Sequence, residues 1–303
     1  MRIVVTGRVG QVVTSLIERG HAQGHEIIAL GRPELDLADP ESVIRALAAA
    51  APDAVVSAAA YTAVDTAESE SARAFAVNGR GAGAVAQATA DLDVPLVHVS
   101  TDYVFDGALD RPYVEVDQAA PTSVYGASKL AGEEAVLAAY RDGSAILRVS
   151  WVYSPFGRNF VKTMLRLAAD RDEIPVVSDQ VGNPTSALDI ADGILRVVSD
   201  LAADASPTLR GVFHMTAAGE ASWADFAEAI VHASLTRGGP YARIRRITTA
   251  EYPTAAPRPA NSRMDCRHIA TVYGIELPHW ESSLDSVIER LRANAPEPRT
   301  IQN

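Results

Sequence analysis

The sequence predicts an α/β protein in which a parallel sheet is covered by helices on both faces. Short runs of β-branched residues alternate with helical patterns through the first half of the chain, and this alternation is typical of right-handed βαβ units. A turn from Gly7 to Gly10 follows the first strand and opens a helix, as in folds that bind dinucleotides. The alternation loosens after about Trp151. These observations predict a Rossmann-type doubly wound sheet with a smaller C-terminal α/β substrate-binding cap.

Five strands with connecting helices are expected in the first half. The strands are predicted at 2–6, 26–30, 54–57, 96–100 and 145–149, and the first helix at 11–22. The second helix has a specific start signal. Asp39 can cap its free N–H groups, Pro40 suits the first helical position and Glu41 lies near the positive end of the helix dipole. We expect this helix to run to Ala51.

The second half is predicted to form mainly the cap. Helices are expected at 160–169, 187–198, 223–233 and 281–293, a strand at 211–216 and an extended loop with three prolines at 252–259. Ser222 is the expected N-cap of the third of these helices. We therefore divide the chain into a dinucleotide-binding domain, residues 1–150, and a mainly substrate-binding part, residues 151–303. Whether elements of the second part return to the first sheet stays open.

Composition and charge exclude several classes of partner. The 303 residues carry a net charge of −11, and an acidic chain repels nucleic-acid phosphates and anionic lipid. No stretch approaches the ~20 apolar residues that span a bilayer, and the first strand follows Met1 without a signal-peptide pattern. Cys266 is the single cysteine, so an internal disulfide is excluded, and we interpret it as a small, partly buried apolar residue. These features predict a cytoplasmic protein.

Gly7, Gly10 and the start of the first helix form a candidate phosphate site. Glycine allows a tight turn and close approach of a pyrophosphate, and the helix N-terminus, at Gln11 and Val12, offers free N–H groups. A Gly-x-x-Gly spacing alone is weak evidence, since a plain turn explains most such matches. Its place between a strand and a helix favours a dinucleotide site. Val13 stands where a third glycine is common, which puts close helix–strand packing in question.

The end of the second strand is where such folds contact the adenosine ribose. Arg32 lies there, and a guanidinium suits the extra phosphate of NADP, whereas an acidic residue would suit NAD. A solvated surface arginine is the alternative interpretation. Asp36 and Leu37 could flank the adenine, although Asp36 could equally be a turn residue before a helix. We expect NADPH as the cofactor, with NADH as the alternative.

Three residues form the candidate catalytic site. The fourth strand ends in Ser100-Thr101-Asp102, and ligands of parallel sheets bind beyond such strand ends. Tyr125 and Lys129, at i and i+4, share one helix face. We expect the lysine charge to lower the phenol pKa and the ammonium to hold the nicotinamide ribose. The phenol would donate a proton to a carbonyl oxygen as hydride arrives at carbon, and Thr101 would hydrogen-bond that oxygen. A lone Tyr-x-x-x-Lys is usually structural, but the preceding glycine turn and Ser-Thr pair make this one specific.

Together these residues resemble the extended short-chain dehydrogenase/reductases, and among them the family of dTDP-4-dehydrorhamnose reductases. The matching segments run through nearly the whole chain, at 6–12, 58–65, 77–78, 100–107, 125–129, 148–153, 159–161, 179–185 and 258–265. The stretch Ser-Thr-Asp-Tyr-Val-Phe-Asp-Gly at 100–107 is the most specific of them. The resemblance implies that NADPH or NADH reduces the 4-keto group of dTDP-4-dehydro-6-deoxy-L-mannose, with Thr101, Tyr125 and Lys129 as the triad.

The resemblance also implies where the two ligands lie. Cofactor contacts are expected from Ala59, Ala60 and Tyr61, and substrate contacts from Thr62, Val64, Thr101, Asp102, Tyr103 and Trp151. Trp151 would lie beside the sugar, and ordinary core packing is the alternative. Arg258 and Arg263, in and just after the loop with three prolines, are candidates for the diphosphate because arginine binds phosphate bidentately. Surface charges on a loop would explain these two arginines equally well.

The expectations about metal binding and assembly depend on a departure from the family pattern. Some members of the family hold magnesium at a dimer interface through a glutamate on the first helix. The matching position here is Ser15, so the sequence argues against magnesium and against that dimer. We expect no metal site, and both a monomer and a homodimer stay open.

Rival functions differ from the reductase at identifiable points. A 4,6-dehydratase of this fold needs an acid–base pair, commonly Asp-Glu after the threonine, whereas here Tyr103 follows Asp102. An epimerase would retain its NAD, and no residue here is diagnostic of one. From another class, a regulatory partner of methionine adenosyltransferase resembles the reductases in fold. The complete triad argues against a purely regulatory subunit but leaves that reading open.

Overall fold

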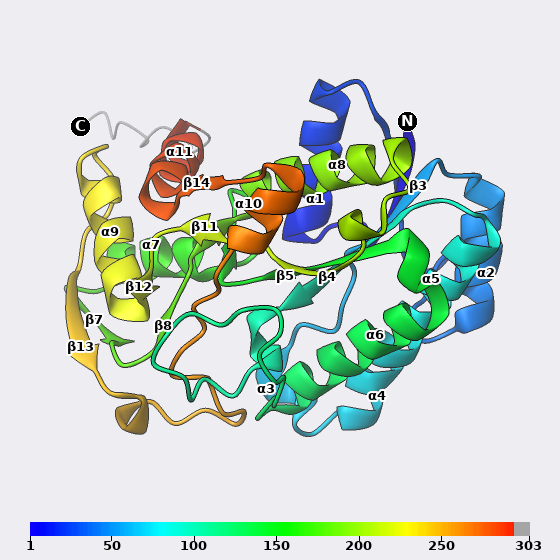
Figure 1. Cartoon of the computed structure of the whole chain (residues 1–303). Coiled ribbons are helices and arrows are strands. Elements are labelled where there is room, and N and C mark those ends of the chain that lie inside the picture. Colours follow the sequence, from blue (N-terminus) through cyan, green and yellow to red (C-terminus); the bar gives the residue numbers. More distant parts are fainter. Residues whose placement is uncertain (294–303) are drawn as a thin grey trace.

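A parallel sheet of six strands forms the centre of the computed structural model, which describes residues 1–293 (Figure 1). In the order β10-β5-β4-β3-β1-β2, the strands are β10 (Gly211–His214), β5 (Ser144–Val149), β4 (Leu96–Thr101), β3 (Ala54–Ser57), β1 (Arg2–Thr6) and β2 (Glu26–Leu30). All neighbouring pairs are parallel. The predicted Rossmann-type sheet is therefore confirmed. Strand β1 has β2 on one side and β3 on the other, so the direction of the strand order reverses at β1. Ligands of such sheets bind in the crevice at this topological switch point.

Helices cover both faces of this sheet (Figure 1). One face carries α1 (Gln11–Ala22), α8 (Ala187–Ala203) and α10 (Arg267–Tyr273), and the other carries α2 (Pro40–Ala50), α5 (Gly81–Asp91) and α6 (Val124–Tyr140). Adjacent strand residues point to opposite faces, so Val4 packs in one core and Val5 in the other, both fully buried. Burial on both faces explains why the strands are continuous apolar runs. The predicted cap of α2 is confirmed, since the Asp39 carboxylate accepts from the Glu41 N–H.

Short helical segments lie between the sheet strands of the first half. They are α3 (Val64–Ala67), α4 (Ser71–Phe75), the π-helical turn η1 (Ala76–Arg80), and the 3-10 turns η2 (Asp102–Val104) and η3 (Arg141–Gly143). Two of them, α3 and η2, follow strand ends directly or through a short loop. They therefore lie at the edge of the sheet where ligands are expected.

The second half contributes a separate lobe with its own core (Figure 1). Its helices are α7 (Phe160–Asp170), α9 (Trp223–Leu235) and α11 (Trp280–Ala293), with the 3-10 turn η5 (Thr249–Glu251). The 3-10 turn η4 (Pro207–Leu209) packs instead in the core of the main sheet, through Leu209. Its short strands are β6 (Val152–Tyr153), β7 (Glu173–Val177), β8 (Val181–Gly182), β9 (Thr185–Ser186), β11 (Ala217–Ala218), β12 (Ala221–Ser222), β13 (Arg243–Ile247) and β14 (Leu277–His279). Ser222 caps α9 as predicted, in a reciprocal capping box with Asp225.

Elements of the second half return to the first sheet. Strand β10 pairs with β5, and Ile190, Ile194 and Leu195 of α8 join the core formed by α1 and the sheet. The boundary at residue 150 stays a prediction, although these contacts show that the chain crosses between the two parts more than once. No helix within residues 1–293 is both long enough and apolar enough to cross a membrane.

Candidate active site

A cavity of about 1060 Å³ lies at the carboxyl ends of the strands, between the sheet and the C-terminal lobe. All the predicted catalytic and cofactor residues line it, as do Thr62, Val64, Asp102, Tyr103 and Trp151. The structure thus brings together residues that are spread over about 150 positions of the sequence. Their individual roles stay predictions.

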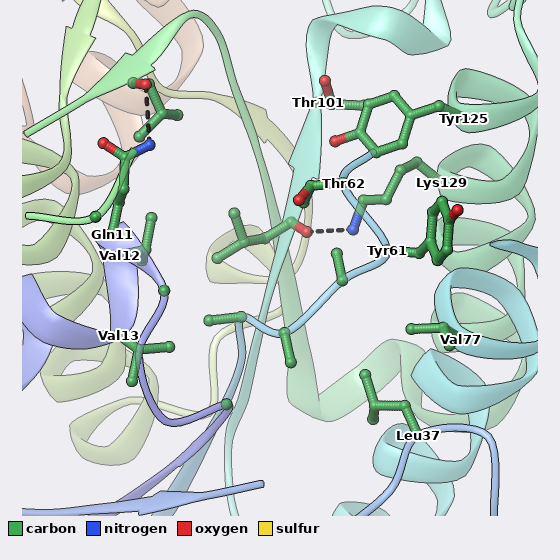
Figure 2. Close-up of a pocket in the computed structure, with 18 of the residues that line it drawn as sticks. Gln11, Val12, Val13, Leu37, Tyr61, Thr62, Val77, Thr101, Tyr125 and Lys129 are labelled. Atoms are coloured by element: carbon green, nitrogen blue, oxygen red, sulfur yellow. Dashed lines mark hydrogen bonds between the residues drawn. The ribbon is translucent and has the colours of Figure 1, made fainter. Parts of the chain in front are cut away.

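The glycine turn and α1 form one wall of this cavity. Gly7 has φ +105°, a conformation that favours glycine, and a Cβ there would lie 3.1 Å from Cγ2 of Val13. Val13 therefore fills the space beside Gly7, and helix and strand pack closely despite the missing third glycine. The side chain of Gln11 points away from the turn (Figure 2), with its Nε2 donating to Val152 O over 3.2 Å and its Oε1 accepting from Ser154 Oγ over 2.8 Å. These contacts connect the start of α1 to the C-terminal lobe.

Two arginines lie at the predicted adenosine end of the cavity. Arg32 lines it as predicted, and so does Arg8, which the sequence analysis missed. Arg8 is ion-paired with Glu34, and a Cβ on Gly31 would lie 3.0 Å from Cγ of Arg8. The missed signal was the position of Arg8 directly after the first glycine. Asp36 has the predicted turn role, since its Oδ1 accepts from the Ala38 N–H over 2.9 Å; it also lines the cavity, and its contact with the adenine stays a prediction.

Tyr125 and Lys129 extend from the first turns of α6 into the cavity, with Thr101 beside the Tyr125 ring (Figure 2). The Ser123 hydroxyl caps the helix by accepting from the Gly126 N–H over 3.1 Å. A Cβ on Gly126 would lie only 2.1 Å from the carbonyl oxygen of Tyr103. This glycine lets α6 pack directly against η2, so the phenol of Tyr125 reaches the end of β4.

Burial dominates the titration of this pair. It raises the pKa of Tyr125 to about 12, with the charge of Asp102 acting in the same direction and the Thr101 hydroxyl opposing it. The prediction that the lysine charge lowers the phenol pKa is therefore wrong for the free chain. Burial also lowers the pKa of Lys129 to about 8, against the opposing charge of Glu133. The Lys129 ammonium donates to Val99 O over 2.7 Å (Figure 2).

Asp102 is a buried carboxyl beside Thr101, the predicted catalytic threonine. The Thr101 hydroxyl donates to its Oδ1 over 2.9 Å, and the Ser150 hydroxyl donates to its Oδ2 over 3.3 Å. Burial nevertheless raises the pKa of Asp102 to about 6. Because Thr101 has a single hydroxyl proton, and that proton is directed at Asp102, the predicted hydrogen bond to a substrate oxygen requires the hydroxyl to rotate.

Asn78, in the π-helical turn η1, connects the loop of the predicted cofactor residues 59–61 to α6 through hydrogen bonds. Its Oδ1 accepts from the Tyr61 N–H over 2.7 Å, and its Nδ2 donates to Tyr61 O over 3.0 Å and to Ser128 Oγ over 2.9 Å. The sequence analysis gave it no role. The residue pair at 77–78 is nevertheless one of the segments that resemble the family, which is the signal that could have identified it.

An aromatic group forms the wall of the cavity on the side of the lobe. Trp151, which has φ +45°, stacks on Trp223 with the ring centroids 3.6 Å apart and the planes at 6°. Phe160 lies 4.6 Å from Trp223, and all three residues line the cavity. Trp223 and Phe160 were not predicted as site residues, because their distance from Trp151 in the sequence gives no hint of this contact.

Arg258 and Arg263 are the two predicted substrate residues that are not on the cavity wall. Arg263 donates to the carbonyl oxygen of Asp110 over 2.6 Å and pairs with Glu220 over 3.2 Å, so its guanidinium is already engaged. Arg258 pairs with Asp65 over 2.8 Å. Both guanidinium groups are therefore engaged within the chain, and the diphosphate role of the two arginines stays a prediction.

Ser15 lies on the first helix, at the position where the sequence comparison with the family places a glutamate that holds magnesium. Ser15 is fully buried on the inner side of α1. Among the residues that the structure describes, no group of three or more His, Cys, Asp or Glu side chains is placed to hold a metal ion. Absence of magnesium and the oligomeric state stay predictions.

Comparison with known proteins gives the family. A family model described as the RmlD substrate binding domain matches residues 1–293. The chain belongs to this family. A dTDP-4-dehydrorhamnose reductase of Sinorhizobium fredii is 50% identical to this RmlD-family chain over 283 residues, covering 93% of the chain and 95% of the relative. The protein of that name from Escherichia coli is 38% identical and covers 96% and 98%.

Solved structures agree with this membership. A dTDP-4-dehydrorhamnose reductase of Clostridium acetobutylicum superposes with a TM-score of 0.89 at 34% identity, covering 96% of this chain and 100% of that one. The protein of that name from Bacillus anthracis, solved in complex with NADP, has a TM-score of 0.88 at 33% identity, covering 95% and 99%.

Proposed function

We propose that this RmlD-family chain is a dTDP-4-dehydrorhamnose reductase, which reduces the 4-keto group of dTDP-4-dehydro-6-deoxy-L-mannose to give dTDP-L-rhamnose. The observation that carries the proposal is that Thr101, Tyr125 and Lys129 line the same cavity as the glycine turn. Relatives of that name match nearly the full length at up to 50% identity, which supports the assignment. We expect the enzyme to act in the cytoplasm, as a monomer or a homodimer.

The residues of the cavity fit a nicotinamide dinucleotide. Gly7 leaves room for a pyrophosphate, and the first turn of α1, from Gln11 to Thr14, is uncharged. Its free N–H groups and the positive end of the helix dipole therefore face an anion without a competing carboxylate in that turn. Lys129 would hold the nicotinamide ribose. NADPH, when bound, supplies the hydride.

The chain's own residues supply the proton and orient the carbonyl group. With a pKa of about 12, Tyr125 keeps its phenolic proton at neutral pH and can donate it to the carbonyl oxygen. Thr101 can donate to the same oxygen after its hydroxyl turns away from Asp102. Asp102 and Lys129 are each 3% exposed, and hydrogen bonds in such buried surroundings are stronger than in water.

Isotope transfer tests the proposed reaction. With NADPH deuterated at the transferred position, NMR of the product should show deuterium at C4 of a dTDP-6-deoxyhexose. An epimerase or dehydratase returns its hydride within one catalytic cycle, so it would leave the product unlabelled. An unlabelled product would remove the reductase assignment.

Cofactor choice should depend on the two arginines at the adenosine end. We expect Arg32→Ala and Arg8→Ala to raise KM for NADPH roughly 10-fold, with a smaller effect on NADH, because each loses a charge-assisted contact to the extra phosphate. Steady-state kinetics with both cofactors measures this. Arg45→Ala, on the exposed side of α2, is the matched control. Equal changes in KM for the two cofactors would show that Arg32 and Arg8 do not contact the extra phosphate of NADPH.

The diphosphate contact is proposed for Arg258. It pairs with Asp65, next to the cavity residue Val64, and its charge partly offsets the burial that raises the pKa of the Tyr103 phenol. We expect Arg258→Ala to weaken binding of both dTDP-sugar and free dTDP in calorimetric titrations, with unchanged NADPH affinity. Arg263→Ala serves as the matched control. If only Arg263→Ala weakened dTDP binding, the position assigned to the diphosphate would be wrong.

A further inference from the structure

His98 lies beneath Lys129, in a part of the site to which the proposed reaction assigns no role. It is on β4, 1% exposed, and its Nε2 lies 3.5 Å from the Lys129 Nζ. Its Nδ1 lies 3.1 Å from the hydroxyl oxygen of Ser57 at the end of β3. The parallel register pairs Ser57 with His98 directly, so the two side chains share one face of the sheet. The sheet therefore fixes a buried row that runs from Ser57 through His98 to Lys129.

The number of hydrogen-bond donors around His98 determines the tautomer of its imidazole. An ammonium group has three donors and no acceptor, and a neutral imidazole has one N–H and one lone pair. Burial and the Lys129 charge both lower the pKa of His98, so the ring is neutral. Nε2 must then accept from Lys129, which leaves the proton on Nδ1, where it is donated to Ser57. Lys129 therefore selects the tautomer that has its lone pair toward the ammonium, and the Ser57 hydroxyl oxygen accepts the Nδ1 proton.

The polar groups around Lys129 show why an acceptor at Nε2 of His98 matters for the ammonium. Its own helix presents Tyr125 and Glu133, β4 presents His98, and η2 presents Asp102 beside Tyr125. The carboxylate of Glu133 is paired with Arg148 over 2.6 Å. Polar contacts of the buried ammonium in the free chain are therefore Val99 O and His98, and both acceptors are uncharged.

We propose that His98 is a positioning residue for Lys129: its imidazole, which donates from Nδ1 to Ser57, accepts from the ammonium through Nε2 and keeps Lys129 charged and directed at the cofactor. The inference rests on the proposed function, since Lys129 is assigned to the cofactor there. The positive charge of Lys129 is present below its folded pKa of about 8 and is lost as the pH rises through that value. Loss of the acceptor should move this transition to lower pH.

NADPH affinity against pH tests the proposal without the sugar substrate. Fluorescence titrations would compare the wild type with His98→Leu, which has no acceptor, and His98→Gln, whose amide oxygen can occupy the place of Nε2. We expect the alkaline loss of affinity to begin about 1 pH unit lower in His98→Leu, the size of one hydrogen bond to a charged group, and near the wild-type pH in His98→Gln. Identical transitions in all three proteins, or equal shifts in both variants, would overturn the proposal.

A second measurement covers the case in which His98→Leu does not fold. Nitrogen-15 NMR of the wild type distinguishes the two imidazole tautomers, and loss of one signal set in His98→Gln assigns His98 among the seven histidines. We expect the Nδ1–H form, and the Nε2–H form would contradict the proposal. Failure of the proposed function would look different, because NADPH would still bind with this pH dependence while the keto-sugar was not reduced.

Discussion

Tyr125→Phe is expected to lower kcat for the keto-sugar by about 100-fold or more, the usual scale of general acid catalysis. The change removes the phenolic proton donor and keeps the ring, which packs edge to face on Tyr103 with the centroids 5.6 Å apart. Folding and NADPH binding should therefore persist. Stopped-flow or steady-state NADPH oxidation measures kcat, and fluorescence titration measures cofactor binding.

Tyr103→Phe is the matched control for this change. It removes a phenol from the neighbouring ring, which also lines the cavity but has no proposed part in proton transfer. We expect a change in KM with kcat largely kept. Turnover of Tyr125→Phe near the wild-type rate would show that another group donates the proton.

Arg148→Met is expected to lower the free energy of unfolding by about 3–5 kcal/mol, because it leaves the Glu133 carboxylate buried without its partner. Side chains of this pair are 6% and 3% exposed, and the guanidinium contacts both carboxylate oxygens, over 2.6 and 2.9 Å. The Ser100 hydroxyl also donates to Glu133. The pair therefore holds α6, which carries Tyr125 and Lys129, against β4 and β5. Urea unfolding measures the loss.

Two comparisons isolate the buried charge as the cause. The double variant Glu133→Leu/Arg148→Met should regain much of the stability, since no unpaired charge remains. Arg45→Ala removes one partner of an exposed pair and should cost less than about 1 kcal/mol. If the double variant lost as much unfolding free energy as Glu133→Leu and Arg148→Met together, the loss would come from packing.

The sheet and the gathering of the candidate catalytic residues in one cavity could be predicted because their signals are local. Strands buried on both faces are continuous apolar runs, and the glycine turn, the Ser-Thr end of β4 and the Tyr-x-x-x-Lys pair each occupy a few consecutive positions. Parallel topology then brings strand ends together without further information. The helix caps at Asp39 and Ser222 were predictable for the same reason.

The remaining features depend on contacts between distant parts of the chain. Strand β13 is rich in arginine and pairs with β7, which contains Pro175, so neither has a simple strand pattern. The stacking of Trp223 on Trp151 and the engagement of Arg263 by Glu220 depend on how the lobe packs. The raised pKa of Tyr125 follows from burial, which the spacing of Tyr125 and Lys129 does not reveal.

The most direct test of the central claim is net NADPH oxidation by the purified chain with dTDP-4-dehydro-6-deoxy-L-mannose. We predict that one NADPH is consumed for each keto-sugar converted, that the product is dTDP-L-rhamnose, and that Tyr125→Phe binds NADPH but oxidises it at about a hundredth of the rate or less. Conversion of the sugar without net NADPH oxidation, or NADPH binding with no conversion by the wild type, would contradict the claim that this chain is a ketoreductase.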